Sequence, residues 1–327
     1  MPHPLFFAAL LFAFITGAND GASLLATNLQ SKAFSPLWAL LILGLAVVVG
    51  PFLLGTAVAS TIAAGLVSFT PSAAVPAVAS SGALLLAVLV AVAVIFALGR
   101  AGLPSSVTQA LTGAIVGAGL GLGLPVEWGN VAKVIVLLLA APLVAGLLSF
   151  VLVRLIVLSG PHGELRAHLR RLHAGSFLAQ SFAYAANDAQ KMIAVTAVAV
   201  GALSARGIVL VSLPVQLTVG AFFVAGTIFG LNRLGGRLGS KLLPVHDQNS
   251  IAAGYAASLA VLGSAALGSP VSMAQSATTG LVAATVSTDG PRVVRWQQAG
   301  RIGATWLLTL PIALLVAAAA GLISRTF

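Results

Sequence analysis

Two Asn-Asp pairs, Asn19-Asp20 and Asn187-Asp188, each lie inside an apolar run long enough to cross a lipid bilayer. An ionised carboxylate in hydrocarbon costs roughly 2.5 to 17 kcal/mol, depending on how far water and lipid adjust around it. A chain that keeps two such groups must fold so that they face a partner or a water-filled cavity. The pairs therefore predict a membrane protein that handles something polar within the bilayer.

The composition also indicates a chain that lies in lipid. Apolar residues make up 59% of the sequence and charged residues 7%, whereas a soluble domain has roughly 25% charged residues. The net charge of +10 comes from 16 Lys and Arg residues scattered in small groups between apolar runs. This pattern is typical of basic loops beside a membrane and not of a nucleic-acid-binding surface. Cysteine is absent, which excludes disulfides, thiolate metal sites and a cysteine nucleophile.

Ten apolar segments are predicted to cross the membrane, since about 20 residues suffice to span its hydrocarbon core. They fall at 5–29, 37–66, 77–99, 104–124, 131–156, 176–203, 208–232, 249–267, 271–288 and 300–324. The segments at 104–124 and 271–288 are short and rich in Gly, Ser and Thr, so each crossing could be made of half-helices. The predicted fold class is an all-α polytopic membrane protein with broken or half-helices at the substrate site.

The distribution of basic residues predicts the orientation. If all ten segments cross and the N-terminus lies outside, 12 of the 16 basic residues, including Arg170 and Arg171, are cytoplasmic. If the two short segments did not cross, the Arg-rich loop at 154–175 would lie outside, against the positive-inside rule. We therefore expect a multi-pass protein of the plasma membrane with both termini outside. His168 and His173, in the same basic region, are expected to face solvent or lipid headgroups.

The sequence motifs recur at a nearly constant offset. Asp20 and Asp188 are 168 residues apart, and the Pro-Ser segments that begin at Pro104 and Pro270 are 166 apart. With five crossings in each half, the second half must be inverted, an arrangement in which secondary transporters hold substrate near the midplane on discontinuous helices. We predict a first transmembrane repeat at 1–158, a cytoplasmic basic linker at 159–175 and a second, inverted repeat at 176–327.

The residues around these motifs offer ligands for a small tetrahedral oxyanion. Gly17 and Gly21 flank the first acidic pair and allow the helix to break, which exposes backbone N–H and C=O groups inside the membrane. Pro104 and Pro270 suit the first turn of a half-helix. The N-terminus of a half-helix attracts anions through free N–H groups and a partial positive charge. Because the two carboxylates repel a bare anion, a bound cation or proton is expected to accompany it.

These motifs resemble those of the inorganic phosphate transporter family often called PiT, which includes sodium-coupled and proton-coupled members. The resemblance rests on Gly17-Ala18-Asn19-Asp20, on Ala186-Asn187-Asp188-Ala189-Gln190-Lys191 and on the Pro-Ser segments at 104–109 and 270–275. It covers nearly the whole chain. It implies an inverted-repeat fold, phosphate bound between the halves and cation coupling through the Asn-Asp pairs.

The residues expected to bind phosphate are Asp20, Ser105, Ser106, Thr108, Asp188, Lys191 and Ser272. The coupling cation is expected at Asn19, Asp20, Asn187, Asp188 and Gln190, which offer oxygen ligands to Na⁺ and carboxylates to H⁺ alike. With sodium coupling, Asn19, Asp20, Asn187 and Asp188 would form the metal site. Lys191, one turn after Asp188, could bind the anion or only neutralise that carboxylate. No cofactor is expected beyond the coupling ion.

The chain departs from the family pattern in its Pro-Ser segments. Where the family commonly has Pro-Val-Ser-Thr-Thr-His, both histidines are replaced, by Gln109 and Gln275, and the second segment lacks both threonines. Sulfate is therefore an alternative substrate for the same fold. Phosphate is favoured because near neutral pH it keeps a proton and can donate a hydrogen bond to Asp20 or Asp188, whereas sulfate only accepts.

Two other classes fit the pattern less well. Paired intramembrane aspartates could form the dyad of an aspartyl protease, but Asn precedes both acids and each pair belongs to a duplication, so no enzyme is expected. A passive anion channel would pass its substrate only down the gradient. The expected partners are inorganic phosphate and the lipid bilayer. A homodimer is compatible with the sequence, and no nucleic-acid partner is expected.

Overall fold

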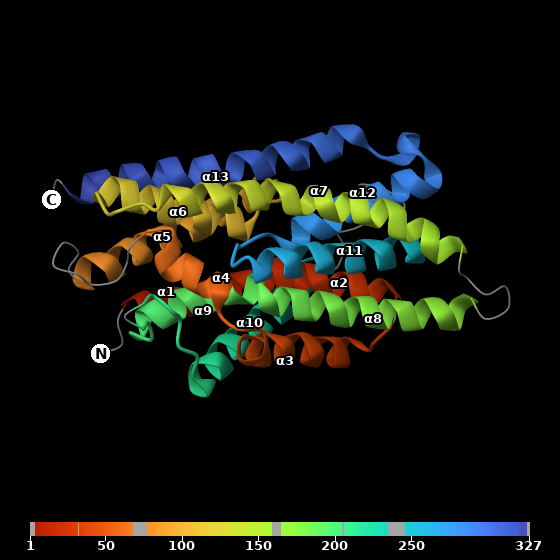
Figure 1. Cartoon of the computed structure of the whole chain (residues 1–327), viewed down its shortest axis with the longest axis horizontal. Coiled ribbons are helices and arrows are strands. Elements are labelled where there is room, and N and C mark those ends of the chain that lie inside the picture. The colour runs from red at the N-terminus through yellow and green to blue at the C-terminus, as the bar shows by residue number, and fades with distance from the viewer. Residues whose placement is uncertain are drawn as a thin grey trace.

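The computed structural model describes residues 4–31, 33–67, 77–158, 165–204, 206–234 and 246–325, and it is built from helices (Figure 1). These are α1 (Pro4–Thr16), η1 (Gly17–Gly21), α2 (Ala22–Ser31), α3 (Pro36–Leu54), α4 (Ala57–Ser60), η2 (Thr61–Gly65), α5 (Ala77–Arg100), α6 (Val107–Leu122), α7 (Trp128–Leu158), α8 (Leu165–Ala186), α9 (Asp188–Ala199), α10 (Leu213–Leu234), α11 (Asp247–Ala266), α12 (Met273–Asp289), η3 (Pro291–Val293) and α13 (Trp296–Ser324). Within the described residues, extended pairing is limited to two isolated bridges. The predicted all-α class is confirmed.

Six helical stretches of the described chain are long and apolar enough to cross a bilayer. They are Pro4–Ala26, Pro36–Leu54, Ser81–Arg100, Trp128–Leu158, Leu213–Leu231 and Trp296–Ser324. Their outer faces carry large apolar side chains, such as Leu143 and Leu147 of α7 at 68% and 69% exposure. Water would not tolerate so extended an apolar surface. The helices therefore form a multi-pass bundle in lipid.

The bundle has two opposite ends. We call the end where α1 begins and α13 ends the terminal face, and the end where α7 ends and α8 begins the α8 face (Figure 1). Two predicted segments run between these faces as broken helices. The segment at 37–66 is interrupted at Gly55, whose φ of 77° favours glycine. The segment at 176–203 is interrupted at Asn187, between α8 and α9.

The segment predicted as a cytoplasmic linker at 159–175 contains the start of a helix. α8 begins at Leu165, and residues 159–164 lie outside the described part of the chain. His173 is only 8% exposed, so the expectation that it faces solvent or headgroups is wrong. It is buried because α11 packs along α8 and brings Asp247 to 3.6 Å from its Nε2 atom.

The first of the two short segments consists of an extended stretch followed by the half-helix α6. α6 lies beside α13 and runs parallel to it, since Gly113 faces Leu310 and Gly117 faces Leu314. A side chain at either glycine would overlap the backbone of α13, so these glycines permit the close contact. α6 therefore accompanies only the part of α13 that leads to the terminal face (Figure 1).

The second short segment has the same construction, with α12 pointing the opposite way. α12 runs parallel to the end of α7, since Thr279 lies beside Gly146 and Ser287 Oγ donates a hydrogen bond of 2.9 Å to the carbonyl of Phe150. α12 thus leads to the α8 face, whereas α6 leads to the terminal face (Figure 1). Neither segment crosses as one continuous helix. Their N-terminal ends meet inside the bundle.

Candidate substrate and ion site

The break in the first helix positions the first acidic pair. Between α1 and α2 the chain widens into the π-helix η1, a form that often occurs at functional positions. Gly17 packs against the backbone at Phe223 of α10, and Gly21 packs against the side chain of Thr227. A larger residue at either position would push α10 away. The glycines therefore allow a widened turn to be buried against a neighbouring helix.

Asp20 lies in this widened turn and has one close polar partner. It is 8% exposed, and its carboxylate accepts a hydrogen bond of 2.8 Å from Asn19 Nδ2. Ser23 Oγ donates to the carbonyl of Asn19 over 2.7 Å, which satisfies a backbone group of the break. Lys191 acts on Asp20 electrostatically but bonds to other groups. The charge of Asp20 is therefore not balanced by an ion pair of its own.

Asp188 lies at the start of α9, and both of its carboxylate oxygens have partners. One carboxylate oxygen is 2.6 Å from Lys191 Nζ, and the other accepts a hydrogen bond of 3.2 Å from the backbone N–H of Met273. The preceding Asn187 donates to the carbonyl of Ser269 and accepts from the N–H of Val271, each over 2.9 Å. The second acidic pair thus holds the extended stretch before α12 in place.

Lys191 is a structural centre of the site. Its side chain is fully buried, and its ammonium group donates to Asp188, to Thr108 Oγ1 and to the carbonyl of Val271. Thr108 in turn donates to the same carbonyl over 3.1 Å. All three donors of the ammonium group therefore have partners within the protein. In this arrangement Lys191 neutralises Asp188 and joins α9 to the starts of α6 and α12.

The two half-helices begin with equivalent serine caps. Ser106 accepts from the N–H of Gln109 over 3.3 Å, and Ser272 accepts from the N–H of Gln275 over 3.4 Å. Their backbone angles nearly coincide, with φ and ψ of −103° and 119° at Ser106 and −107° and 117° at Ser272. Each cap satisfies one of the first-turn N–H groups of its helix, and in α12 the N–H of Met273 is also taken, by Asp188. Ser105, one residue before its cap, is partly buried.

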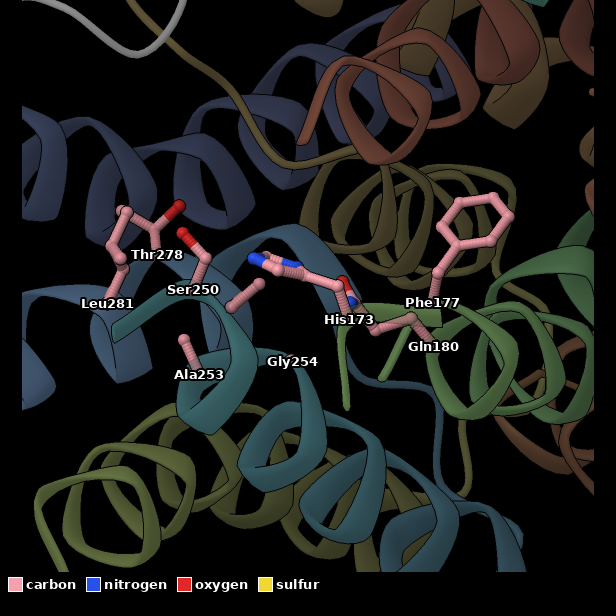
Figure 2. A pocket seen from close by; sticks show the side chains of 9 residues that line it. His173, Phe177, Gln180, Ser250, Ala253, Gly254, Thr278 and Leu281 are labelled. Carbon is pink, nitrogen blue, oxygen red and sulfur yellow. The ribbon is translucent and has the colours of Figure 1, made fainter. Parts of the chain in front are cut away.

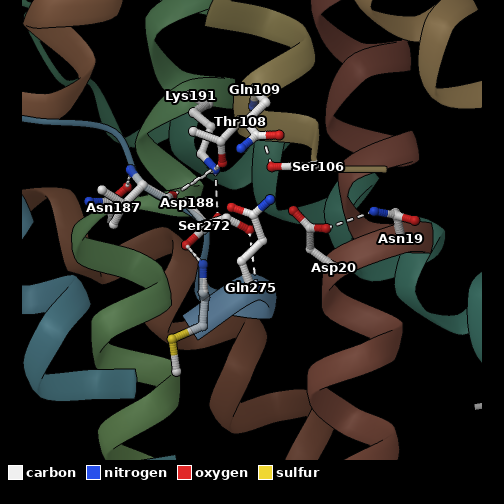
Figure 3. Close-up of polar contacts among 12 residues, drawn as sticks. Asn19, Asp20, Ser106, Thr108, Gln109, Asn187, Asp188, Lys191, Ser272 and Gln275 are labelled. Carbon is white, nitrogen blue, oxygen red and sulfur yellow. Dashed lines mark hydrogen bonds and ion pairs between the residues drawn. The ribbon is translucent and has the colours of Figure 1, made fainter. Parts of the chain in front are cut away.

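Both glutamines that replace the expected histidines face this space. Figure 3 shows Gln109 and Gln275 turned toward the carboxylate of Asp20. Gln109 Oε1, both amide atoms of Gln275 and Ser276 Oγ are buried without a hydrogen-bond partner in the described chain. Buried polar groups are nearly always satisfied by protein, water or a ligand. These unpaired atoms therefore mark a place for a polar ligand or water.

Gln190, predicted as a cation ligand, forms hydrogen bonds to backbone groups instead. Its Oε1 atom accepts from the N–H of Ala59 over 2.9 Å, and its Nε2 atom donates to the carbonyls of Gly55 and Ala186. The side chain therefore joins the break after α3 to the break before α9. Its amide is occupied by backbone groups and does not face Asp20.

Tyr184 belongs to the site although the sequence did not single it out. It is 1% exposed, its hydroxyl has no hydrogen-bond partner in the described chain, and both Asp20 and Asp188 act on it electrostatically. The available signal was its place one turn before Asp188 in a chain with only two tyrosines. Alone, that spacing would also fit an ordinary core tyrosine.

Known proteins are similar to this chain over most of its length. The profile of a family described as "Phosphate transporter family" matches residues 16–160 and again 158–317. A "Probable low-affinity inorganic phosphate transporter" of Mycobacterium bovis is 34% identical over 330 residues, which is 95% of this chain and 74% of the relative. One of the same description from Bacillus subtilis is 27% identical and covers 93% of this chain and 91% of the relative.

A solved structure has the same fold. It is described as "The sodium-dependent phosphate transporter", and it superposes with a TM-score of 0.83 over 99% of this chain and 98% of the other, at 20% sequence identity. At that identity the similarity concerns the arrangement of helices.

Proposed function

We propose that this chain, which belongs to the phosphate transporter family, moves inorganic phosphate across the membrane in symport with a cation. The proposal rests on one observation. The capped N-terminal ends of two half-helices meet inside the bundle, and the unpaired amides of Gln109 and Gln275 lie there beside Asp20. The two matches to the family profile support a site built from both halves. The descriptions of the bacterial relatives support inorganic phosphate as the substrate.

The half-helices supply the attraction for the anion. Each helix N-terminus carries roughly half a positive charge and free N–H donors. Thr108 and the carbonyl of Val271 bring the two N-termini together. The Nε2 atom of Gln275, which has no partner in the described chain, adds a donor. A tetrahedral oxyanion offers acceptors on all sides, which matches donors that converge from opposite halves.

The coupling cation is assigned to Asp20. A carboxylate beside an anion site repels the substrate unless a cation or proton neutralises it. Asp188 already has Lys191 for this purpose, whereas Asp20 has only the amide of Asn19. Na⁺ could bind the carboxylate of Asp20, the side-chain oxygen of Asn19 and carbonyls freed by the widened turn. A proton could bind the carboxylate itself. Both ions fit this donor set.

Asp20 also bears on the choice between phosphate and sulfate. Hydrogen phosphate has an O–H that can donate to a carboxylate, and sulfate at neutral pH has none. A carboxylate beside the anion therefore repels phosphate less than sulfate, because it accepts the phosphate O–H, and the coupling ion offsets the repulsion that is left. A passive channel is also disfavoured. A channel has no need of an acid that must be neutralised by a cation, as proposed for Asp20.

The charges at the two ends of the bundle support a cytoplasmic α8 face. Arg170 and Arg171 lie near the start of α8, and Arg292 and Arg295 lie between α12 and α13. Basic residues concentrate on the cytoplasmic side of membrane proteins. Both termini then lie outside, as the sequence predicts. Residence in the plasma membrane is a further part of the proposal. A homodimer is compatible with the sequence, and neither of these two points rests on a described contact.

Uptake by reconstituted protein tests the proposal. The purified chain is placed in liposomes, and accumulation of radiolabelled phosphate is followed under an imposed Na⁺ gradient or an imposed proton gradient, each with and without excess sulfate. Protein-free liposomes and liposomes with a collapsed gradient serve as controls. We expect accumulation above equilibrium under one gradient and little competition by sulfate. Downhill flux alone, or equal competition by sulfate, would contradict the proposal.

A further inference from the structure

A cavity with a mostly apolar lining and a few polar groups lies between the central site and the α8 face. It has a volume of about 110 Å³ and is enclosed by α8, α11 and α12. Figure 2 shows His173, Ser250 and Thr278 turned toward a common space in it. Gln180 adds a further polar group to the lining, and Phe177 and Leu281 complete it. None of these residues belongs to the anion or cation site described above.

The opposite side of the central site is closed by direct hydrogen bonds. Thr56 Oγ1 donates to the carbonyl of Val209 over 3.2 Å, and Ser60 Oγ accepts from the N–H of the same residue over 3.1 Å. Gln190 joins the same broken segment to α9. Lys133 Nζ donates to the carbonyl of Leu267 over 2.7 Å. A transporter that alternates its access exposes its site to one side at a time, so the closed terminal side directs attention to the cavity.

Polar groups lead from the cavity to the carboxylates. His173 and Gln180 line the cavity, Tyr184 follows Gln180 by one turn of α8, and Asp188 follows Tyr184 by another. The Nε2 atom of His173 and the hydroxyl of Tyr184 have no hydrogen-bond partner in the described chain. The amide of Gln275 continues the series into the central site. Gln180 itself is hydrogen-bonded within α8. The buried, unpaired atoms of His173, Tyr184 and Gln275 are stable only if water or a polar ligand contacts them.

The entrance carries charges of both signs. Asp247, whose side chain is 63% exposed, lies 3.6 Å from Nε2 of buried His173. His246 and Asp289 form a second such pair at 3.7 Å, and exposed Arg170 and Arg171 lie within the turn before His173. Asp247 lies beyond hydrogen-bond distance of the His173 Nε2 atom, so an oxyanion that enters can form the hydrogen bond that Asp247 does not. The acid at the rim thus does not seal the cavity.

We infer that this cavity is the route by which the oxyanion passes between the central site and the α8 face, with His173, Ser250 and Thr278 in contact with it on the way. The inference rests on the proposed function for the identity of the anion. The route itself depends only on the cavity, the closed opposite side and the row of unpaired polar atoms.

Thiol labelling tests the route directly, because the natural chain has no cysteine. Ser250→Cys and Thr278→Cys introduce a single thiol into the cavity, and Leu259→Cys places one on an exposed apolar position of α11 as the matched control. Each variant is treated in liposomes with the anionic reagent 2-sulfonatoethyl methanethiosulfonate and with a cationic reagent of similar size. We expect both cavity thiols to react faster with the anionic reagent. Inorganic phosphate should slow that reaction severalfold, and the control should not react.

The outcomes separate the route from the proposed function. If both cavity variants transport phosphate but resist the anionic reagent, the route is wrong and the function stands. If the cationic reagent reacts faster and phosphate gives no protection, the cavity serves cations and the inference is overturned. If wild-type liposomes take up no phosphate while the thiols still prefer the anionic reagent, the route holds for another anion. Normal size-exclusion profiles exclude misfolded variants from the comparison.

Discussion

Asp20 and Asp188 each follow an asparagine at a break in a membrane helix, but their partners differ. Asp188 has the ammonium group of Lys191 and the N–H of Met273, whereas among the described residues the hydrogen-bond partner of Asp20 is the amide of Asn19. A buried carboxylate with a base is neutral as a pair and holds helices together. One without a base needs a mobile cation. The difference indicates that Asp188 has a structural role, and it is the reason that the proposed coupling ion is placed at Asp20.

The largest expected effect comes from removing the base. Lys191→Met leaves Asp188 buried without a counter-charge, which should lower the free energy of unfolding by about 3–5 kcal/mol. Thermal unfolding in detergent, followed by circular dichroism, measures the loss. The double variant Asp188→Asn/Lys191→Met should regain most of the stability, because neither charge is then left alone. If Lys191→Met is as stable as the wild type, the ion pair is not what holds Asp188 in place, and the proposed difference between Asp20 and Asp188 is wrong.

The next effect concerns transport. Asp20→Asn should reduce gradient-driven phosphate accumulation at least about tenfold, the equivalent of about 1.4 kcal/mol, because the site no longer requires a cation. Its stability should be unchanged or higher, since no ion pair is broken. Uptake and unfolding are measured on the same preparation. Unimpaired accumulation against a gradient in this variant would show that the coupling ion binds elsewhere.

The two serine caps should behave alike. Ser106→Ala and Ser272→Ala each remove an N-cap, which typically costs about 0.5–2 kcal/mol of stability, and both should raise the phosphate concentration for half-maximal uptake severalfold. Ser35 caps α3 in the same way, with the N–H of Trp38 at 3.4 Å, but at a helix end away from the site. Ser35→Ala should cost similar stability and leave half-saturation unchanged. An equal rise of the phosphate half-saturation concentration in all three variants would show that the caps affect transport only through stability.

The smallest effect on stability is expected at an unpaired amide. Gln275→Met removes buried polar atoms without partners, so the free energy of unfolding should be unchanged or slightly higher. The phosphate concentration for half-maximal uptake should rise. Gln216 of α10 is the matched control, because its amide atoms are also buried and unpaired in the described chain. Gln216→Met should have the same effect on unfolding and none on half-saturation. A similar transport defect in both would indicate a general effect of core polarity.

Much of the site followed from local chemistry. Glycines at the first break, the Pro-Ser starts of the half-helices and the apolar length of the spans are read from neighbouring residues. Gln190 shows the limit of such reasoning. Its oxygen suited a cation, but in the fold it accepts from the N–H of Ala59, a residue 131 positions away. His173 is a second case, since a basic segment predicts exposure and the packing of α11 buries it.

The sequence by itself determined that the chain spans a membrane as a set of helices, and that two acids and two Pro-Ser segments interrupt those helices. These features depend on hydrophobicity and on backbone preferences, which act over a few residues. Only the tertiary structure decided which acid is neutralised and which amides stay unpaired. Those properties depend on contacts such as Lys191 with Thr108, between residues far apart in the sequence, and a contact of this kind is fixed only when the whole bundle packs.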